Sequence, residues 1–404
     1  MLPAIEHDYI GAVGGRHQAV VDEYGSVRPD RYGWWLDWWI GADDRWHVPA
    51  SEVAVRRTLR DGLPVVETAM RVPGGDAVHR AYGVGGPGDL AVVEIENASP
   101  APFVGAFVVR GARDFTWREG SLLVDRLPVL TPARSPSRWA ATRDGRIQMV
   151  VTGGGASPDV PGPLHDRGAR LDVALLYPVP HRTRIRLALT LGRSLEIAAP
   201  DELPGADDVV RGWERQLERA CRVEVPDEQL TRQIRGARAA LLLAASRTHV
   251  DGETVAALEA WGFDEEAADA WPRLGRREQK RAAQRGQEAA GGAPATASGW
   301  PEVRTLAATG DPSFLLSVRA LLVRDRGGGH LEVVPEWPPE WRGLGLEVHD
   351  APTRAGLVSF AVRWHGERPA LLWSVPAGAH LRAPGLDASW ETDDENGEAM
   401  LGAS

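Results

Sequence analysis

The stretch that decides the fold class is Arg184-Ile185-Arg186-Leu187-Ala188-Leu189-Thr190-Leu191. Large apolar residues recur at every second position along it, which is the spacing of a β-strand. We therefore expect a strand with one buried face. That face carries Ile185, Leu187, Leu189 and Leu191.

Short apolar stretches separated by Gly, Pro and Asp fill the chain before this strand. The pattern predicts many short strands joined by turns, and we interpret residues 1–202 as an N-terminal β-sandwich. The clearest further strands are predicted at Val65–Met70, Leu90–Ile95, Phe103–Val109, Ile147–Val151 and Leu171–Leu176.

The apolar spacing becomes helical after residue 202. An apolar stripe in Asp227–Ala245 predicts a helix that begins after Asp227. The residues of this stripe are Leu230, Ile234, Ala237, Leu241 and Ala245. The other helices of this middle part are predicted at Leu203–Arg222, Gly252–Trp261, Asp264–Trp271 and Pro312–Val323.

Residues 275–299 contain almost no large apolar side chain, so we expect a mobile segment there. From residue 327 a β pattern returns, with strands predicted at Leu331–Val334, Leu346–His349, Leu357–Trp364 and Ala370–Val375. The expected fold is therefore mainly β with a smaller α part. Its three domains are a sandwich (1–202), a short helical region (203–326) and a C-terminal β-domain (327–404).

The composition limits the choice of partners. Of 404 residues, 43% are hydrophobic and 25% charged, which is typical of a globular protein, and the net charge is −10. This charge argues against nucleic acid or an anionic membrane as a partner and favours a neutral or cationic ligand. Ordinary solubility is the alternative explanation of the charge.

The N-terminal residues carry acids and no apolar signal region, and no apolar run approaches the length of a membrane span. Cys221 is the only cysteine, so an intrachain disulfide is excluded. We expect a cytoplasmic protein.

Most signatures of cofactor and metal sites are missing. Gly83-Val84-Gly85-Gly86-Pro87-Gly88 fits the dinucleotide pattern, but a strand and not a helix is predicted to follow it. The eleven histidines have no ligand spacing. We therefore predict neither a cofactor nor a metal.

The 16 tryptophans are unusual, and several crowd into residues 34–46. Exposed indole rings stack on sugar rings, so Trp34, Trp38 and Trp261 are candidate substrate-binding residues. Packing in a hydrophobic core is the alternative for each of them. Trp337, Trp341, Trp364 and Trp373 leave the same two interpretations open.

Glycoside hydrolysis requires two facing carboxylates. Acidic residues are frequent in the helical middle, and Asp251 and Glu253 are the candidate catalytic pair because Asp251-Gly252-Glu253 lies in a turn between predicted helices. The alternative is that Asp251 caps a helix and Glu253 is an acid favoured by the helix dipole.

A family resemblance is carried by residues 10–27, the strand of residues 92–99, the helical segment of residues 257–267, and the C-terminal segments 334–341, 352–354 and 363–373. These stretches resemble the glucoamylase-like proteins of glycoside hydrolase family 15, within the six-hairpin glycosidases. The resemblance implies an N-terminal β-supersandwich, a helical barrel and a C-terminal β-cap, and a function in carbohydrate metabolism.

The sequence departs from that family in its helical part. A six-hairpin barrel needs about a dozen helices, or roughly 300 residues, whereas about 120 residues lie between the β parts here. No glutamate matches the family's catalytic acid or base. Asp251 lies where the family has a substrate-contacting Asp, but the Arg that precedes that Asp is missing.

Three hypotheses follow. The first is a glycoside-hydrolase-like protein that binds an oligo- or polysaccharide, such as an α-glucan, with catalysis reduced or lost. The second is an active glycosidase with paired carboxylates in a groove between helices and sandwich. The third is a scaffold whose shortened helices bury an apolar stripe against a second subunit, which predicts a homodimer.

Overall fold

The structure is a computed structural model that describes residues 7–86, 88–143, 145–165, 170–194, 199–280, 299–307 and 312–402. It is mainly β with a smaller helical part, as predicted. The chain divides into two compact units, Glu6–Arg211 (the first unit) and Gly212–Ser404 (the second unit). The middle helices and the C-terminal strands thus lie in one compact unit, while the division into three domains stays a prediction.

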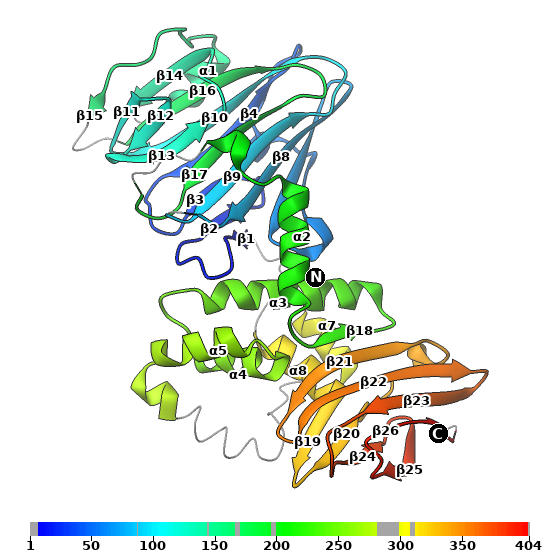
Figure 1. Cartoon of the computed structure of the whole chain (residues 1–404). Coiled ribbons are helices and arrows are strands. Elements are labelled where there is room, and N and C mark those ends of the chain that lie inside the picture. The colour runs from blue at the N-terminus through cyan, green and yellow to red at the C-terminus, as the bar shows by residue number, and fades with distance from the viewer. Residues whose placement is uncertain are drawn as a thin grey trace. The chain divides into compact units, whose positions relative to one another are not determined.

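Two antiparallel sheets build the first unit within the described residues (Figure 1). The eight-stranded sheet has the order β1 (His7–Ile10), β2 (Ala19–Asp22), β3 (Val27–Pro29), β4 (Trp35–Gly41), β10 (Phe103–Ala112), β16 (Leu171–Val179), β14 (Arg138–Arg143), with β5 (Trp46–His47) beside β4. The nine-stranded sheet has the order β15 (Leu164–His165), β11 (Asp114–Arg118), β12 (Ser121–Val124), β13 (Leu127–Pro132), β17 (Arg184–Thr190), β9 (Leu90–Asn97), β8 (Gly75–Val84), β7 (Val65–Val72), β6 (Val55–Leu59).

The two sheets share one hydrophobic core. It holds Ile10 and Trp38 from one sheet and Val66 and Leu187 from the other. The predicted face of β17 is confirmed, since Ile185, Leu187, Leu189 and Leu191 are all buried in this core. The opposite face of β17 is also covered, because Arg186 is only 7% exposed.

One predicted strand is wrong. Residues Ile147–Thr152 form the helix α1, whereas a strand was expected at Ile147–Val151. Ile147 and Val151 are buried four positions apart, and Met149 between them is exposed. Burial with helical spacing onto a small core around Trp39 therefore outweighs the β propensity of these residues.

The dinucleotide-like glycines lie in a β-hairpin. Gly83 is part of β8 and Leu90 begins β9, so a strand follows the motif as expected. A Cβ atom on Gly83 would lie 2.2 Å from the carbonyl carbon of Gly11, which is far inside contact distance. Close approach of two backbones explains this glycine.

The second unit contains the predicted helices, with small differences at their ends. Its described α-helices are α2 (Ala206–Leu217), which begins in the first unit, α3 (Glu228–Ala245), α4 (Gly252–Trp261), α5 (Asp264–Ala270), α7 (Trp300–Leu306) and α8 (Pro312–Leu322). Short 3-10 turns occur in the two units at Pro49–Ser51, Arg60–Gly62, Pro200–Glu202, Trp271–Arg273 and Pro339–Trp341. Most of the expected mobile segment 275–299 lies outside the described residues.

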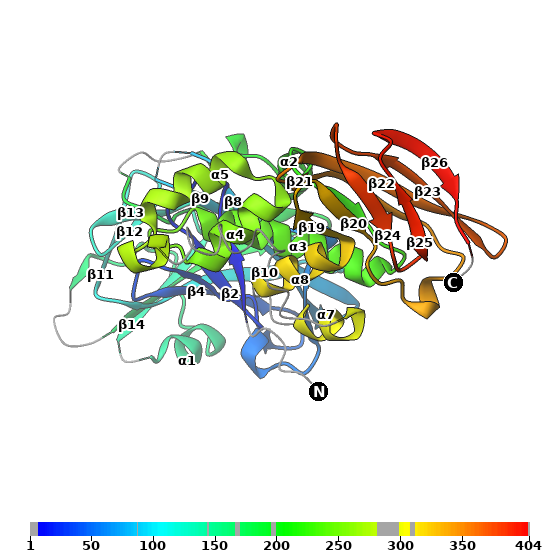
Figure 2. The same cartoon turned by 90° about the horizontal axis from the view of Figure 1, so that it is seen from below.

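Two further sheets complete the second unit (Figure 2). The five-stranded sheet has the order β18 (Arg222–Glu224), β21 (Leu346–Thr353), β22 (Gly356–His365), β23 (Arg368–Ser374), β26 (Asn396–Met400). The four-stranded sheet has the order β19 (Val323–Gly327), β20 (His330–Val333), β24 (His380–Ala383), β25 (Asp387–Thr392), with β20 and β24 parallel. Helix α4 packs against α3, α8 and β21.

Candidate functional site

A pocket of about 130 Å³ lies in the second unit, where three segments meet. The first segment links β20 to β21, the second is the β22–β23 hairpin and the third links β24 to β25. The lining residues are Trp337, Pro339, Arg342, Trp364, Glu367, Pro369, Gly385 and Leu386. The pocket combines aromatic surface with one cationic and one anionic side chain.

Two tryptophans form an aromatic corner of the pocket. The ring centroids of Trp337 and Trp364 are 5.8 Å apart, and their planes are inclined at 49°. Trp337 also meets Trp341 edge to face at 6.0 Å, and Trp341 contacts Trp300 at 4.5 Å. Trp300 and Trp341 are buried, whereas Trp337 and Trp364 are partly exposed, so the row of rings ends in the pocket.

Hydrogen bonds from α7 hold the Trp337 segment in place. The Trp300 indole donates to the carbonyl of Glu336 at 3.3 Å, and Arg304 of α7 donates to Glu340 at 2.7 Å. Arg304 also donates to Asp227, the N-cap of α3, at 3.3 Å. These contacts connect the aromatic corner to two helices of the same unit.

The backbone next to the pocket is strained. Val334 has a φ of 45°, a conformation that a β-branched residue rarely adopts and that costs about 1–3 kcal/mol. Its carbonyl accepts the Gly385 N–H at 3.0 Å. A Cβ atom on Gly385 would lie 2.5 Å from that carbonyl oxygen and 2.7 Å from the Trp337 nitrogen. The pocket wall at position 385 therefore requires glycine.

The two charged side chains of the pocket differ in their environment. Both are exposed, but Arg342 makes a further interaction within the chain. The carboxylate of Glu367 has no hydrogen-bond or ion-pair partner among the described residues. The indole N–H groups of Trp337 and Trp364 likewise have no acceptor in the described part of the chain. The two indole N–H groups are buried, so the group that the pocket offers without a partner is the Glu367 carboxylate.

The predicted catalytic residues lie elsewhere in the second unit, at the start of α4. Asp251 is the N-cap, and its carboxylate accepts the Thr254 N–H at 2.7 Å. Glu253 lies in the first turn, and both side chains are exposed. This is the arrangement that was the alternative in the sequence, in which Asp251 caps α4 and Glu253 is an acid in its first turn.

The predicted substrate-binding tryptophans are buried, which contradicts a stacking role. Trp34 and Trp38 lie in the core of the first unit, and Trp38 stacks on His79 at 5.0 Å. Trp261 is fully buried in the second unit and donates to the carbonyl of Leu315 at 3.1 Å. The core-packing alternative holds for all three, because the apolar area of an indole is large enough to dominate its placement.

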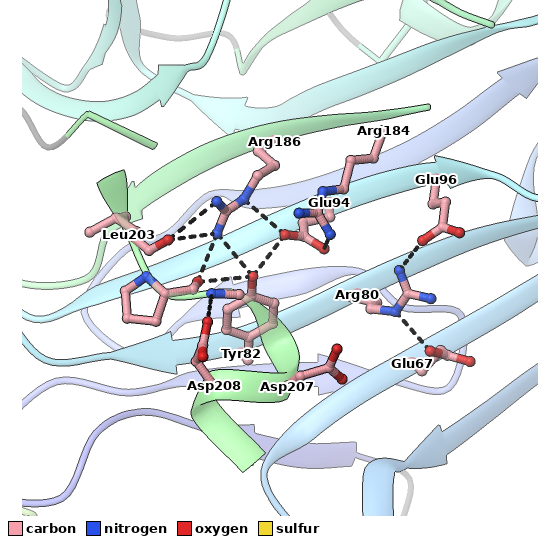
Figure 3. Close-up of polar contacts among 12 residues, drawn as sticks. Glu67, Arg80, Tyr82, Glu94, Glu96, Arg184, Arg186, Leu203, Asp207 and Asp208 are labelled. Carbon is pink, nitrogen blue, oxygen red and sulfur yellow. Dashed lines mark hydrogen bonds and ion pairs between the residues drawn. The ribbon is translucent and has the colours of Figure 1, made fainter. Parts of the chain in front are cut away.

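A buried polar network lies on the nine-stranded sheet (Figure 3). Arg186 forms an ion pair with Glu94 at 2.8 Å, and the Tyr82 hydroxyl donates to Glu94 at 2.8 Å. Arg186 also donates to the carbonyls of Leu203 and Pro204. Burial, together with the Glu94 charge, raises the pKa of Tyr82. Since protein groups satisfy most of these atoms, we assign the network to structure.

Two carboxyls with raised pKa flank Arg110 on the eight-stranded sheet. Arg110 donates to Asp37 at 3.4 Å, and its Nε lies 3.8 Å from an oxygen of Asp172. Burial raises the pKa of both carboxyls above the ordinary value of 3.8. Asp172 also accepts the Gly111 N–H at 3.0 Å, so this cluster ties neighbouring strands together.

Sequence reasoning named Trp337 and Trp364 as ambiguous and missed Arg342, Glu367 and Gly385. The one available signal was their position in segments rich in Pro, Trp and Gly near the C-terminus.

Neither a cluster of metal-ligating side chains nor a membrane-spanning helix occurs among the described residues. Among them, no three His, Cys, Asp or Glu side chains gather closely enough to hold a metal ion. None of the helices described is both long and apolar enough to span a membrane. No protein-family model and no curated protein matches the chain.

Proposed function

We propose that the protein binds a saccharide in the pocket at Trp337 and Trp364, as a glycoside-hydrolase-like protein whose catalysis is reduced or lost. The observation that carries the proposal is the partly exposed aromatic corner with a cationic and an anionic side chain beside it. Indole rings stack on the apolar faces of sugar rings, and charged side chains bind hydroxyl groups.

The size of the pocket supports a small ligand group. A cavity of about 150 Å³ in another protein holds one benzene molecule, so a pocket of about 130 Å³ encloses part of one sugar ring, and the rest of the ligand lies in solvent. Prolines at positions 339 and 369 add rigid apolar walls. A rigid pocket lowers the entropy cost of binding.

The positions of Asp251 and Glu253 at the start of α4 do not call for a catalytic role of this predicted pair. Asp251 is engaged as an N-cap, a role that accounts for an acid at this position without a catalytic function. The proposal therefore concerns recognition, and hydrolysis is measured alongside it.

A ligand screen tests the proposal. The full-length protein is heated with maltooligosaccharides, cellooligosaccharides, xylooligosaccharides and trehalose, and the same samples are analysed for products. A ligand at 100 times its Kd stabilises the folded protein by about 2.7 kcal/mol. We expect stabilisation without product. Absence of any shift with these saccharides and with the tetramers named below, confirmed by calorimetry, contradicts saccharide binding. Product formation contradicts the loss of catalysis.

A further inference from the structure

The pocket has a carboxylate without a partner among the described residues. Glu367 has no partner among the described residues, whereas Arg342 already interacts within the chain. The whole chain carries a net charge of −10, so its long-range field also attracts cations. A ligand with a positive charge would find its counter-ion at Glu367.

The aromatic corner favours a cation as well. The faces of indole rings carry a negative potential, which attracts a nearby cation. Trp337 and Trp364 meet at 49° beside Glu367 in the same pocket. Two indole rings and a carboxylate line the same pocket, a combination suited to an ammonium group.

We propose that the saccharide bound by this pocket is an amino sugar with a free ammonium group. This inference rests on the proposed saccharide binding and adds the charge class of the ligand. The ammonium donates hydrogen bonds to the Glu367 carboxylate while the ring lies against Trp337 and Trp364. N-acetylation removes the charge and a uronic acid reverses it, so both are poorer ligands.

Three tetramers with the same β-1,4 backbone test the inference by calorimetry on the full-length protein at about pH 6 and low salt. They are the tetramers of glucosamine, N-acetylglucosamine and glucose, which differ at C2. We expect the glucosamine tetramer to bind about fivefold more tightly than the glucose tetramer, since exposed charge pairs and cation–π contacts are each worth up to about 1 kcal/mol. The preference should shrink in 0.5 M salt.

Matched variants separate the pocket from the overall charge. Glu367→Gln should shrink the preference for the glucosamine tetramer over the glucose tetramer, because the charge–charge contribution is lost while the contact with the indole rings remains. Glu398→Gln removes an equal, exposed charge on β26, outside the pocket, and should keep the preference. Trp364→Ala should weaken both ligands.

The outcomes distinguish the two proposals. Equal affinity for the glucosamine and glucose tetramers, or a preference that is unchanged in Glu367→Gln, overturns the inference and leaves saccharide binding intact. If no tetramer and none of the other saccharides binds, both proposals fail.

Discussion

Replacing His79 with phenylalanine should remove an acid-sensitive contribution to the stability of the first unit. His79 is 1% exposed, stacks on Trp38 and has no partner for its Nδ1 atom among the described residues. Burial, with a smaller effect of the Arg80 charge, lowers its pKa from 6.5 to about 3. The imidazole is therefore neutral in the folded protein near pH 5 and protonated in the unfolded chain.

The sign and size of the effect follow from this difference. Because the folded-state pKa is lowered, the stability from neutral His79 is complete above the unfolded pKa of 6.5. It is lost as the pH falls from there towards the folded pKa. Each pH unit in that interval costs about 1.4 kcal/mol, so the loss between pH 6.5 and pH 5.0 is about 2 kcal/mol.

Urea unfolding followed by tryptophan fluorescence measures the effect at several pH values. Wild type should lose about 2 kcal/mol more than His79→Phe between pH 6.5 and pH 5.0. His249→Gln, a change at an exposed histidine, should follow wild type. Parallel pH profiles of wild type and His79→Phe would refute the claim that a neutral imidazole is buried in this core.

Three further changes test other parts of the structure. Tyr82→Phe removes a hydroxyl that is hydrogen-bonded to Glu94 and Arg186, and it should lower the free energy of unfolding in urea by about 1–3 kcal/mol. Tyr177→Phe is the control, because its buried hydroxyl has no partner among the described residues, and it should cost less. Equal costs would contradict the network. Gly385→Ala should lower thermal stability and weaken saccharide binding, because the added Cβ collides with the backbone of the pocket wall. Gly212→Ala, where a Cβ meets nothing within 4 Å, should do neither. Unchanged binding in Gly385→Ala would contradict the described wall. Burial raises the pKa of Asp172 in the folded protein, so its contribution to stability is complete at pH values below the unfolded pKa of about 3.8 and is lost as the pH rises through the folded-state pKa. Asp172→Asn should therefore gain stability relative to wild type as the pH rises in that interval. A stability difference that does not depend on pH would contradict this sign.

Regular elements with a clear period could be predicted from the sequence. The alternation at Arg184–Thr190 is β17, and the capped stripe after Asp227 is α3. Helix α4 begins and ends at the predicted residues, because Asp251 caps it and Gly262 ends it in a left-handed conformation. Ile147–Thr152 was not predictable, since a short apolar run has no distinctive period and its neighbours decide its form.

The candidate site could be predicted only in fragments. Trp337, Trp364 and Gly385 lie in three separate segments, and only the pairing of the C-terminal strands brings them together. Composition also gives no information on which tryptophans are buried. Trp34 and Trp38 are candidates in the sequence because they lie in a dense tryptophan cluster, and this cluster belongs to the hydrophobic core. Periodicity reports local structure, whereas this pocket is a product of tertiary packing.

The most direct test of the central claim is a calorimetric titration of wild type, Trp364→Ala and Trp271→Ala with the saccharide that stabilises the protein most. Trp271 is a partly exposed tryptophan outside the pocket and serves as the matched control. We predict that Trp364→Ala raises Kd about tenfold or more, a loss of about 1.4 kcal/mol, while Trp271→Ala binds as wild type does. Equal affinities in all three proteins would contradict a binding site at Trp337 and Trp364.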